Sequence, residues 1–274
     1  MGDDYGHGRR SGTILVVAGL DPSGGAGLLA DARHIERHGF HCAGVATALT
    51  EQDSRMCAWM HPISAEIVSN QLARLVDDLD GTIRAVKVGM LANAEIAAVV
   101  ARVLRRLHTD DREGVPVVVD PVLRATRGVP LLEVSEAKSA REAYAPLLGL
   151  TRLITPNLAE LAELSGVAGI HTPDEMIEAA LRLRALGPAA VLAKGGHLDG
   201  DPIDILVDEQ GVTHFGGQRV EGPSPHGTGC ALSTDIACRL AMAVPLREAV
   251  GAATEHIRVL IANAVTVGKG RPFL

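Results

Sequence analysis

The sequence predicts a three-layer α/β protein, in which helices cover both faces of a mostly parallel central sheet. Short and almost continuously apolar runs alternate with segments of helical periodicity along most of the chain. Strands that are covered on both faces are typically apolar at nearly every position, and a repeated strand–helix order favours parallel pairing. The predicted buried strands are residues 14–18, 42–47, 85–88, 117–120, 152–155 and 189–194.

The helices between these strands are recognised by their end signals. Ser64 and Asn93 each precede a helical pattern and are good N-cap residues. Residues 172–175 read Thr-Pro-Asp-Glu, which is a capping box with proline in the first turn. Residues 203–208 and 212–215 flank a Glu-Gln-Gly turn and predict a hairpin. Besides the helix that follows Thr172, the predicted helices cover residues 26–38, 65–79, 94–107, 229–243 and 246–267.

Length alone would allow one or two domains, and the uniform composition favours one domain behind a short tail. The chain has 274 residues, and 47% of them are hydrophobic, which is enough for one large core. Residues 1–12 are polar and rich in glycine, so we expect a flexible N-terminal tail there. No break in composition, long linker or internal repeat divides residues 13–274, which we assign to a single domain.

Charge and cysteine spacing exclude several classes of partner. The net charge of −7 argues against nucleic acid or an anionic membrane surface as the main partner. No apolar run reaches the length of a membrane span, and no secretory signal is visible. The four cysteines form no C-x-x-C pair, and no cysteine–histidine cluster has zinc spacing. We therefore expect a protein of the reducing cytoplasm that binds neither nucleic acid nor membrane.

A glycine-rich segment directly follows the first predicted strand. Gly19, Gly24, Gly25 and Gly27 lie in a strand-to-helix turn, where residues without side chains let a ligand approach the backbone closely. The segment has neither the lysine of a Walker A loop nor a G-x-G-x-x-G pattern. For the glycines taken alone, ligand binding and a flexible turn are equally good interpretations.

A second segment, residues 224–230, leads into an apolar helix. Gly227, Thr228 and Gly229 are small, so the backbone N–H groups at the helix start are free to face an anion, and the helix dipole favours negative charge there. Cys230 follows in the first turn, where the pKa of a thiol tends to fall. The segment predicts either an anion hole with a general base beside it, or a helix start with a buried and inert cysteine.

Four further polar residues lie at the ends of predicted strands, at the edge where open parallel sheets bind ligands. Asn157 and Glu160 have the spacing of a capping box, which is compatible with phosphate contact by Asn157 and with Mg²⁺ near Glu160, directly or through water. Lys194 can reach nucleotide phosphates as a point charge, and Asp120 offers a carboxylate at the same edge. Each residue alone fits a cap, a turn or a solvated side chain, but their joint position favours a phosphoryl-transfer site.

In their order along the chain, these segments resemble the signatures of the hydroxymethylpyrimidine/phosphomethylpyrimidine kinases, which belong to the ribokinase-like class. The resemblance extends over nearly the whole chain, from Ile14 to the last helix, and the combination of motifs is highly specific. The matching segments are residues 19–27 with Asp31 following, 47–53, 87–91, 118–122, 155–157, 194–197 and 226–230.

The resemblance implies a ribokinase-like fold and an enzyme that uses ATP and Mg²⁺. Its substrates would be 4-amino-5-hydroxymethyl-2-methylpyrimidine and the monophosphate of that compound, giving the pyrimidine diphosphate for thiamine diphosphate biosynthesis. Cys230 would be the catalytic base, and a homodimer is implied. The pyrimidine pocket would be lined by Gly19, Ala26, Asp31, Gln52, Met90 and Val122, the anion hole would be formed by Gly227, Thr228 and Gly229, and the ATP phosphates would be bound by Asp120, Asn157, Glu160 and Lys194.

The residue chemistry agrees with this resemblance, although the sequence departs from the family pattern in places. A carboxamide such as Gln52 can pair with both the donor and the acceptor on the edge of an aminopyrimidine. Residues 122–128 lack the Lys-Ser-Gly pattern common in the family, and Arg124 or Arg127 is a candidate for phosphate contact in its place. The alternatives are pyridoxal kinase activity on the same fold, and a pyrimidine- or nucleotide-sensing protein that has lost turnover.

Overall fold

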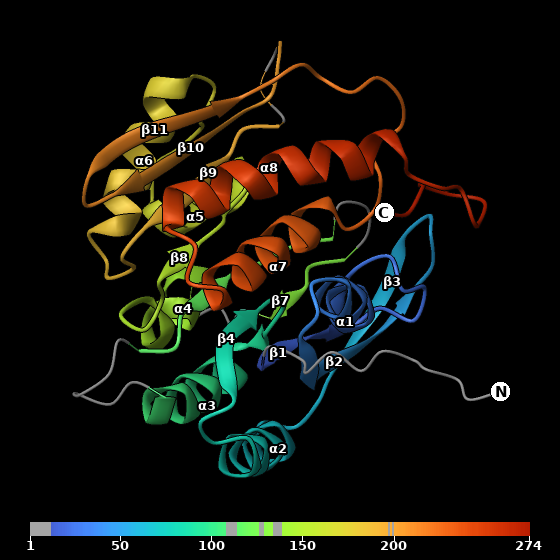
Figure 1. The fold of residues 1–274 in the computed structure, drawn as a ribbon, viewed down its shortest axis with the longest axis vertical. Coiled ribbons are helices and arrows are strands. Elements are labelled where there is room, and N and C mark those ends of the chain that lie inside the picture. Colours follow the sequence, from blue (N-terminus) through green and yellow to red (C-terminus); the bar gives the residue numbers. More distant parts are fainter. Residues whose placement is uncertain (1–11, 108–113, 126–128, 134–138, 197, 199) are drawn as a thin grey trace, which may run out of the picture.

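A mainly parallel sheet forms the centre of the protein (Figure 1). The computed structural model describes residues 12–107, 114–125, 129–133, 139–196, 198 and 200–274. Apart from Gly12, the predicted N-terminal tail lies outside the described residues. The strands of the sheet are β1 (Thr13–Leu20), β2 (His41–Gln52), β3 (Cys57–Pro62), β4 (Ile83–Val88), β6 (Val117–Val119), β8 (Leu153–Ile154), β9 (Val191–Lys194), β10 (Ile203–Asp208) and β11 (Gly211–Gly216).

Within the described residues, these nine strands follow the order β11-β10-β9-β8-β6-β4-β1-β2-β3. The strands from β9 to β2 in this order pair in parallel. β3 lies at one edge, antiparallel to β2, and the β10–β11 hairpin lies at the other edge, antiparallel to β9. Two short strands, β5 (Ala92–Asn93) and β7 (Leu132–Glu133), form a separate pair. The predicted fold class and the predicted hairpin are therefore confirmed.

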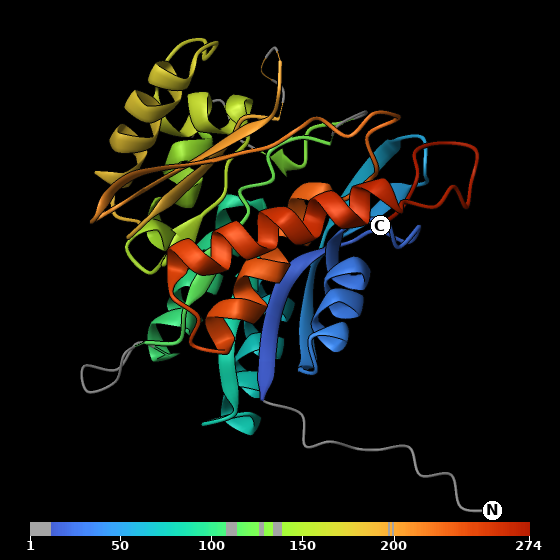
Figure 2. The ribbon, with the colours of Figure 1, turned by 45° about the horizontal axis from the view of Figure 1, so that its top comes forward.

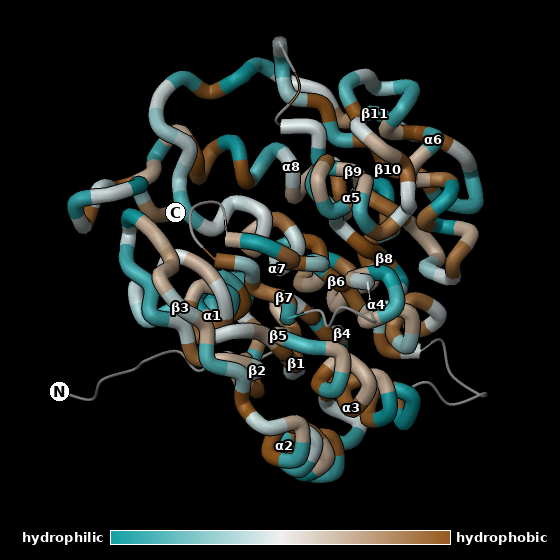
Figure 3. Tube along the Cα trace, turned by 180° about the vertical axis from the view of Figure 1, so that it is seen from behind, coloured by the Kyte–Doolittle hydropathy of each residue, from teal (hydrophilic) through white to brown (hydrophobic). Residues whose placement is uncertain are grey.

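Two layers of helices cover the sheet. One layer contains α1 (Gly27–Arg37), α7 (Thr228–Ala241) and α8 (Leu246–Ala262), which lie together in Figures 1 and 2. The opposite layer contains α2 (Ala65–Asp78), α3 (Ala94–Leu104), α4 (Ala140–Leu148), α5 (Leu158–Ser165) and α6 (Pro173–Arg184). Figure 3 shows the molecule from the side opposite to that of Figure 1. No helix in the described part of the chain is both long enough and apolar enough to cross a bilayer.

Alternate residues of the central strands enter the two cores. In β1, Ile14, Val16 and Ala18 pack with the α1, α7 and α8 layer, whereas Leu15 and Val17 pack with the opposite layer. All five side chains are fully buried. This burial on both faces explains why the central strands appear in the sequence as continuous apolar runs.

Local side-chain hydrogen bonds begin several helices where the sequence predicts. The Ser64 side chain accepts a hydrogen bond from the Ile67 N–H, and the Asn93 side chain accepts one from the Ile96 N–H. At Thr172 the complete capping box is present. These three N-caps are therefore confirmed, and they fix the helices that follow β3, β5 and α5.

The structure differs from the prediction at some elements. β3 was not predicted, because its apolar run is short and is followed by His61 and Pro62, and a proline within such a run argues against a strand. α4 was also not predicted, although Ser139 forms a capping box at its start. The helix predicted over residues 94–107 ends in a 3-10 turn (Arg105–Leu107), and the helix predicted over 246–267 ends at Ala262.

Candidate active site

A cleft with a volume of about 370 Å³ lies at the carboxyl ends of the parallel strands. Residues near the ends of β1, β2, β4, β6 and β9 line one wall, and the start of α7 with one side of α8 lines the other. Among the described residues that the sequence singled out for ligand contact, the cleft contains all except Asp31. Those in the cleft are Gly19, Ala26, Gln52, Met90, Val122, Asp120, Arg124, Asn157, Glu160, Lys194, Gly227, Thr228, Gly229 and Cys230.

The glycine-rich segment and the start of α7 are in backbone contact. Gly227, the N-cap residue of α7, has a φ of +81°, and a Cβ atom there would lie only 2.0 Å from the Gly25 carbonyl oxygen. A side chain is therefore excluded at this position by both conformation and space. The first backbone bond of α7 runs from the Ala231 N–H to the Gly227 carbonyl. The N–H groups of Thr228 and Gly229 precede this bond and lie where a helix start binds anions.

An ion pair lies beside this helix start. Lys194 Nζ donates to Asp120 Oδ1 at 2.8 Å, and a Cβ atom on Gly229 would lie 3.1 Å from the same Nζ. Asp120 is almost fully buried, and burial alone would raise its pKa. The charges of Lys194 and Lys87 outweigh burial, so the pKa of Asp120 is lowered. The site thus holds a lysine charge next to the N–H groups that face the cleft.

Lys87 is a site residue to which the sequence analysis gave no role. It is fully buried in β4, lines the floor of the cleft and donates to Asp31 Oδ2 at 2.6 Å. Burial by itself would lower the pKa of Lys87, but the Asp31 carboxylate raises it and keeps the lysine charged. Asp31, expected in the pyrimidine pocket, instead lies behind Lys87 and also accepts from the Thr234 hydroxyl at 2.7 Å. A lysine inside an apolar strand was the available sequence signal.

Asn157 and Glu160 form the predicted capping box and also line the cleft. The Asn157 N–H donates to Glu160 Oε2 at 2.8 Å, and the Glu160 N–H donates to Asn157 Oδ1 at 3.0 Å. Burial raises the pKa of Glu160 to about 7; the Lys194 charge opposes this increase and the Asp120 carboxylate adds to it. Two carboxylates on one wall supply the oxygen ligands that Mg²⁺ prefers, so Asp120 and Glu160 fit this ion.

Cys230 is the third residue of α7, and it lines the cleft. Burial raises the pKa of its thiol to about 11, although the Lys87 charge acts in the opposite direction. The expected lowering of the thiol pKa at this helix start is therefore wrong. The loss of hydration is the largest cause, and the carboxylates of Asp120 and Asp31 raise the pKa of the thiol further.

Gln52 is held by two residues that the sequence analysis did not select. Its Nε2 lies 3.1 Å from Asp21 Oδ2 and 2.7 Å from His226 Nε2, and the last two atoms are 2.9 Å apart. One imidazole nitrogen cannot donate and accept at the same time, so at most two of these three contacts are hydrogen bonds at any moment. Because the protein engages the amide nitrogen, Oε1 is the amide atom left for a ligand. A ligand paired with Gln52 in this arrangement must donate a hydrogen bond, rather than use both edges of the amide.

Asp21 also organises the glycine-rich turn. It accepts hydrogen bonds from the Ser23 N–H at 2.8 Å and the Ala26 N–H at 3.0 Å. A carboxylate that accepts bonds within its own turn is a common local device, and this role was readable from the sequence. Its contacts with Gln52 and His226 were not, because they join three segments that are far apart in the sequence.

Met90 and Val122 supply an apolar part of the cleft wall. A Cβ atom on Gly19 would lie 2.2 Å from Met90 Cε, so the methionine packs directly on this glycine. Arg124 also lines the cleft and is exposed, whereas Arg127 lies outside the described residues.

Comparison with known proteins gives consistent matches over most of the chain. The family described as phosphomethylpyrimidine kinase matches residues 21–273. A hydroxymethylpyrimidine/phosphomethylpyrimidine kinase of Rhizobium meliloti is 40% identical over 260 residues, which cover 94% of each chain.

Solved structures agree in both fold and extent. A phosphomethylpyrimidine kinase of Clostridium difficile has a TM-score of 0.74 and 32% identity, with 91% of this chain and 99% of that chain covered. The ADP complex of a pyridoxal kinase from Bacillus subtilis has a TM-score of 0.81 and 28% identity, with 95% of each chain covered. The three-layer arrangement of sheet and helices is thus shared with kinases of the ribokinase-like fold.

Proposed function

Because the chain belongs to the phosphomethylpyrimidine kinase family, we propose that its cleft transfers the γ-phosphate of ATP to the hydroxymethyl group of 4-amino-5-hydroxymethyl-2-methylpyrimidine and to the monophosphate of that compound. The observation that carries this proposal is the arrangement in one cleft of an amide acceptor, a thiol and a helix start with a lysine beside it. These groups match the three parts of the reaction: the pyrimidine edge, the attacking hydroxyl and the transferring phosphoryl group.

Gln52 orients the pyrimidine in this proposal. Its Oε1 accepts a hydrogen bond from the exocyclic amine, while Asp21 and His226 hold the amide nitrogen. Met90 and Val122 contact the apolar ring and its methyl group. A ring that carries an acceptor in place of the amine would put two oxygens against each other, and the site would reject it.

The phosphoryl group lies between the hydroxyl and the start of α7. The hydroxyl oxygen forms a new bond to the γ-phosphorus as the bond from that phosphorus to the β-phosphate oxygen breaks, and ADP leaves. The thiolate form of Cys230 accepts the hydroxyl proton. The N–H groups of residues 228 and 229, together with the Lys194 charge, stabilise the negatively charged oxygens of the transferring phosphoryl group.

Mg²⁺ belongs to the same proposal, held by Glu160, directly or through water, with Asp120 beside it, and it would neutralise charge on the ATP phosphates. Asn157, which lines the same cleft, would contact the phosphates. We also propose that the enzyme acts in the cytoplasm without nucleic-acid or membrane partners, in agreement with its cysteine spacing and its charge. A homodimer belongs to the same proposal.

A turnover assay with Mg-ATP tests this function. The pyrimidine alcohol, its monophosphate and pyridoxal are offered in parallel, and ADP release is measured together with the phosphorylated product. We expect turnover of both pyrimidines and a much lower kcat/KM for pyridoxal. Preferential turnover of pyridoxal would contradict the proposal in favour of a pyridoxal kinase, and tight binding without turnover of any of the three would indicate a sensor.

A further inference from the structure

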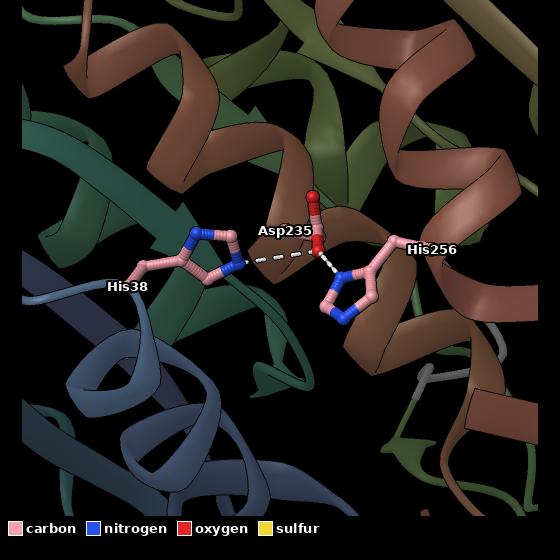
Figure 4. Close-up of side chains that lie close together, drawn as sticks. All are labelled: His38, Asp235 and His256. Atoms are coloured by element: carbon pink, nitrogen blue, oxygen red, sulfur yellow. Dashed lines mark hydrogen bonds and ion pairs between the residues drawn. The ribbon is translucent and has the colours of Figure 1, made fainter. Parts of the chain in front are cut away.

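Outside the cleft, His38, Asp235 and His256 form a compact group that we call the His–Asp–His cluster (Figure 4). His38 directly follows α1, Asp235 lies within α7 and His256 lies within α8. Both imidazole rings point to the same carboxylate oxygen: His38 Nε2 lies 3.2 Å from Asp235 Oδ2, and His256 Nδ1 is hydrogen-bonded to that atom. The three donor atoms all lie within 4.8 Å of one another.

The donor set of the cluster is that of a transition-metal site. Two imidazole nitrogens with one carboxylate oxygen are ligands typical of Zn²⁺ and related divalent ions, with a fourth position left for water. The Arg239 Nε donates to the other oxygen, Asp235 Oδ1, at 2.5 Å. This bond orients the carboxylate and leaves Oδ2 directed at the two rings, as outer partners of metal ligands do.

The cluster is open to ions on one side and closed on the other. Asp235 is fully buried, whereas the His38 and His256 side chains are 15% and 37% exposed. His34, one turn before His38 on α1, is a buried neighbour of the cluster.

We propose that the His–Asp–His cluster binds one divalent transition-metal ion of the Zn²⁺ class, which ties α1 to α7 and α8. None of the three ligands lines the cleft among the described residues, so this ion is separate from the Mg²⁺ of phosphoryl transfer. Its role is structural: it clamps the helical layer whose α7 start forms the anion hole. A proton-bridged contact of the same three side chains is the competing arrangement.

Titration with Co²⁺ and Zn²⁺ in the absence of nucleotide tests the site. Co²⁺ bound by two histidines and a carboxylate gives visible d–d absorption without the near-ultraviolet thiolate bands that binding to a cysteine would add. Zn²⁺ affinity and the accompanying change in melting temperature are measured in parallel. The variants are His38→Gln and His256→Gln, and the matched control is His214→Gln, which changes an exposed histidine on β11.

The parent chain and His214→Gln should bind one ion per chain at the cluster and melt at a higher temperature with Zn²⁺. Each cluster variant should bind at least about tenfold more weakly, since even the loss of an outer partner costs about 10–100-fold in metal affinity. The metal-free melting temperatures show whether the variants fold. Equal affinity in the parent and the cluster variants would overturn the proposal. So would a parent chain that binds no Co²⁺, which would leave the proton-bridged contact.

Discussion

At Gln52, the proposed pairing with the pyrimidine depends on one amide oxygen. Gln52→Leu keeps most of the side-chain volume but removes Oε1, so the exocyclic amine of the substrate loses its partner. An unpaired polar group costs about 1–3 kcal/mol, and the KM for the pyrimidine should rise by about tenfold or more while the KM for ATP stays constant. Glu51→Gln, which changes the exposed neighbour, is the control. Steady-state kinetics with an unchanged pyrimidine KM would remove Gln52 from the pocket.

At Cys230, the raised thiol pKa makes the role of base testable by pH. If the thiolate accepts the proton, Cys230→Ala should lower kcat by about 10²–10⁴ and Cys230→Ser should do much the same, with little change in Mg-ATP affinity. Cys42→Ala, outside the cleft, should keep the parent rate.

The pH profile distinguishes a base from a positioning residue at Cys230. A pKa of about 11 means that thiolate is scarce at neutral pH, so the parent kcat should increase by about tenfold per pH unit above pH 7 where chemistry limits the rate. A flat profile together with an inactive Cys230→Ala variant would assign Cys230 a positioning role instead.

At Glu160, burial makes the stability of the nucleotide-free protein depend on pH. The pKa of about 7 in the folded protein exceeds the ordinary value of 4.5, so the folded state binds this proton more tightly than the unfolded state does. The stability that protonated Glu160 contributes is fully present below pH 4.5 and is lost as the pH rises through 7. As the pH rises from 5 to 8, the free energy of unfolding of the parent should fall by about 2–3 kcal/mol relative to that of Glu160→Gln.

Urea melts at the two pH values measure this difference at Glu160. Glu163→Gln, at an exposed position on the same helix, is the matched control and should follow the parent. A parent and a Glu160→Gln variant with parallel pH profiles would show that Glu160 ionises normally. The variant should also turn over more slowly, because a neutral amide binds Mg²⁺ poorly.

At the scale of elements, we expect the contact between the glycine-rich turn and the start of α7 to maintain the proposed phosphate site. Gly227→Ala introduces a side chain at a φ of +81° and against the Gly25 carbonyl. Gly39→Ala is a matched control, because Gly39 has a φ of +80° and no atom within 4 Å of its Cβ position. The shared conformational cost is about 1–2 kcal/mol. Gly227→Ala should be less stable than this shared cost explains, and it alone should lose most of its kcat. Urea melts measure the stability, and a turnover assay measures kcat. Equal effects of the two changes would show that the contact does not matter.

At the scale of the whole molecule, we predict that a second copy packs against the β2–β3 edge. Leu49 and Trp59 are 45% and 57% exposed and lie on the same face of this antiparallel pair. Burying an exposed tryptophan and an adjacent leucine favours association. We therefore expect the parent to sediment as a dimer and Trp59→Glu to sediment as a monomer. Val212→Glu, on the strand at the opposite edge, should remain dimeric. A monomeric parent would contradict the predicted homodimer.

The order of strands and helices, and the sheet edge where the site lies, follow from the sequence because the forces that set them are local. A strand buried on both faces is apolar at nearly every position, and a capping side chain reaches only three residues along the chain, as at Ser64 and Asn93. The sequence predicts that the glycine-rich turn and the residues that follow the strands lie together, because parallel strands all end at the same edge of the sheet.

Tertiary structure decided the properties that depend on partners distant in sequence. Lys87 meets Asp31 across 56 residues, and His38 meets Asp235 across 197. Neither pair has a spacing pattern, so no periodicity predicts it. The thiol pKa of Cys230 likewise depends on how deeply its surroundings bury it, and its place at the start of a helix did not reveal that burial. Charge and hydration act through space, and only the folded chain brings these groups within reach of one another.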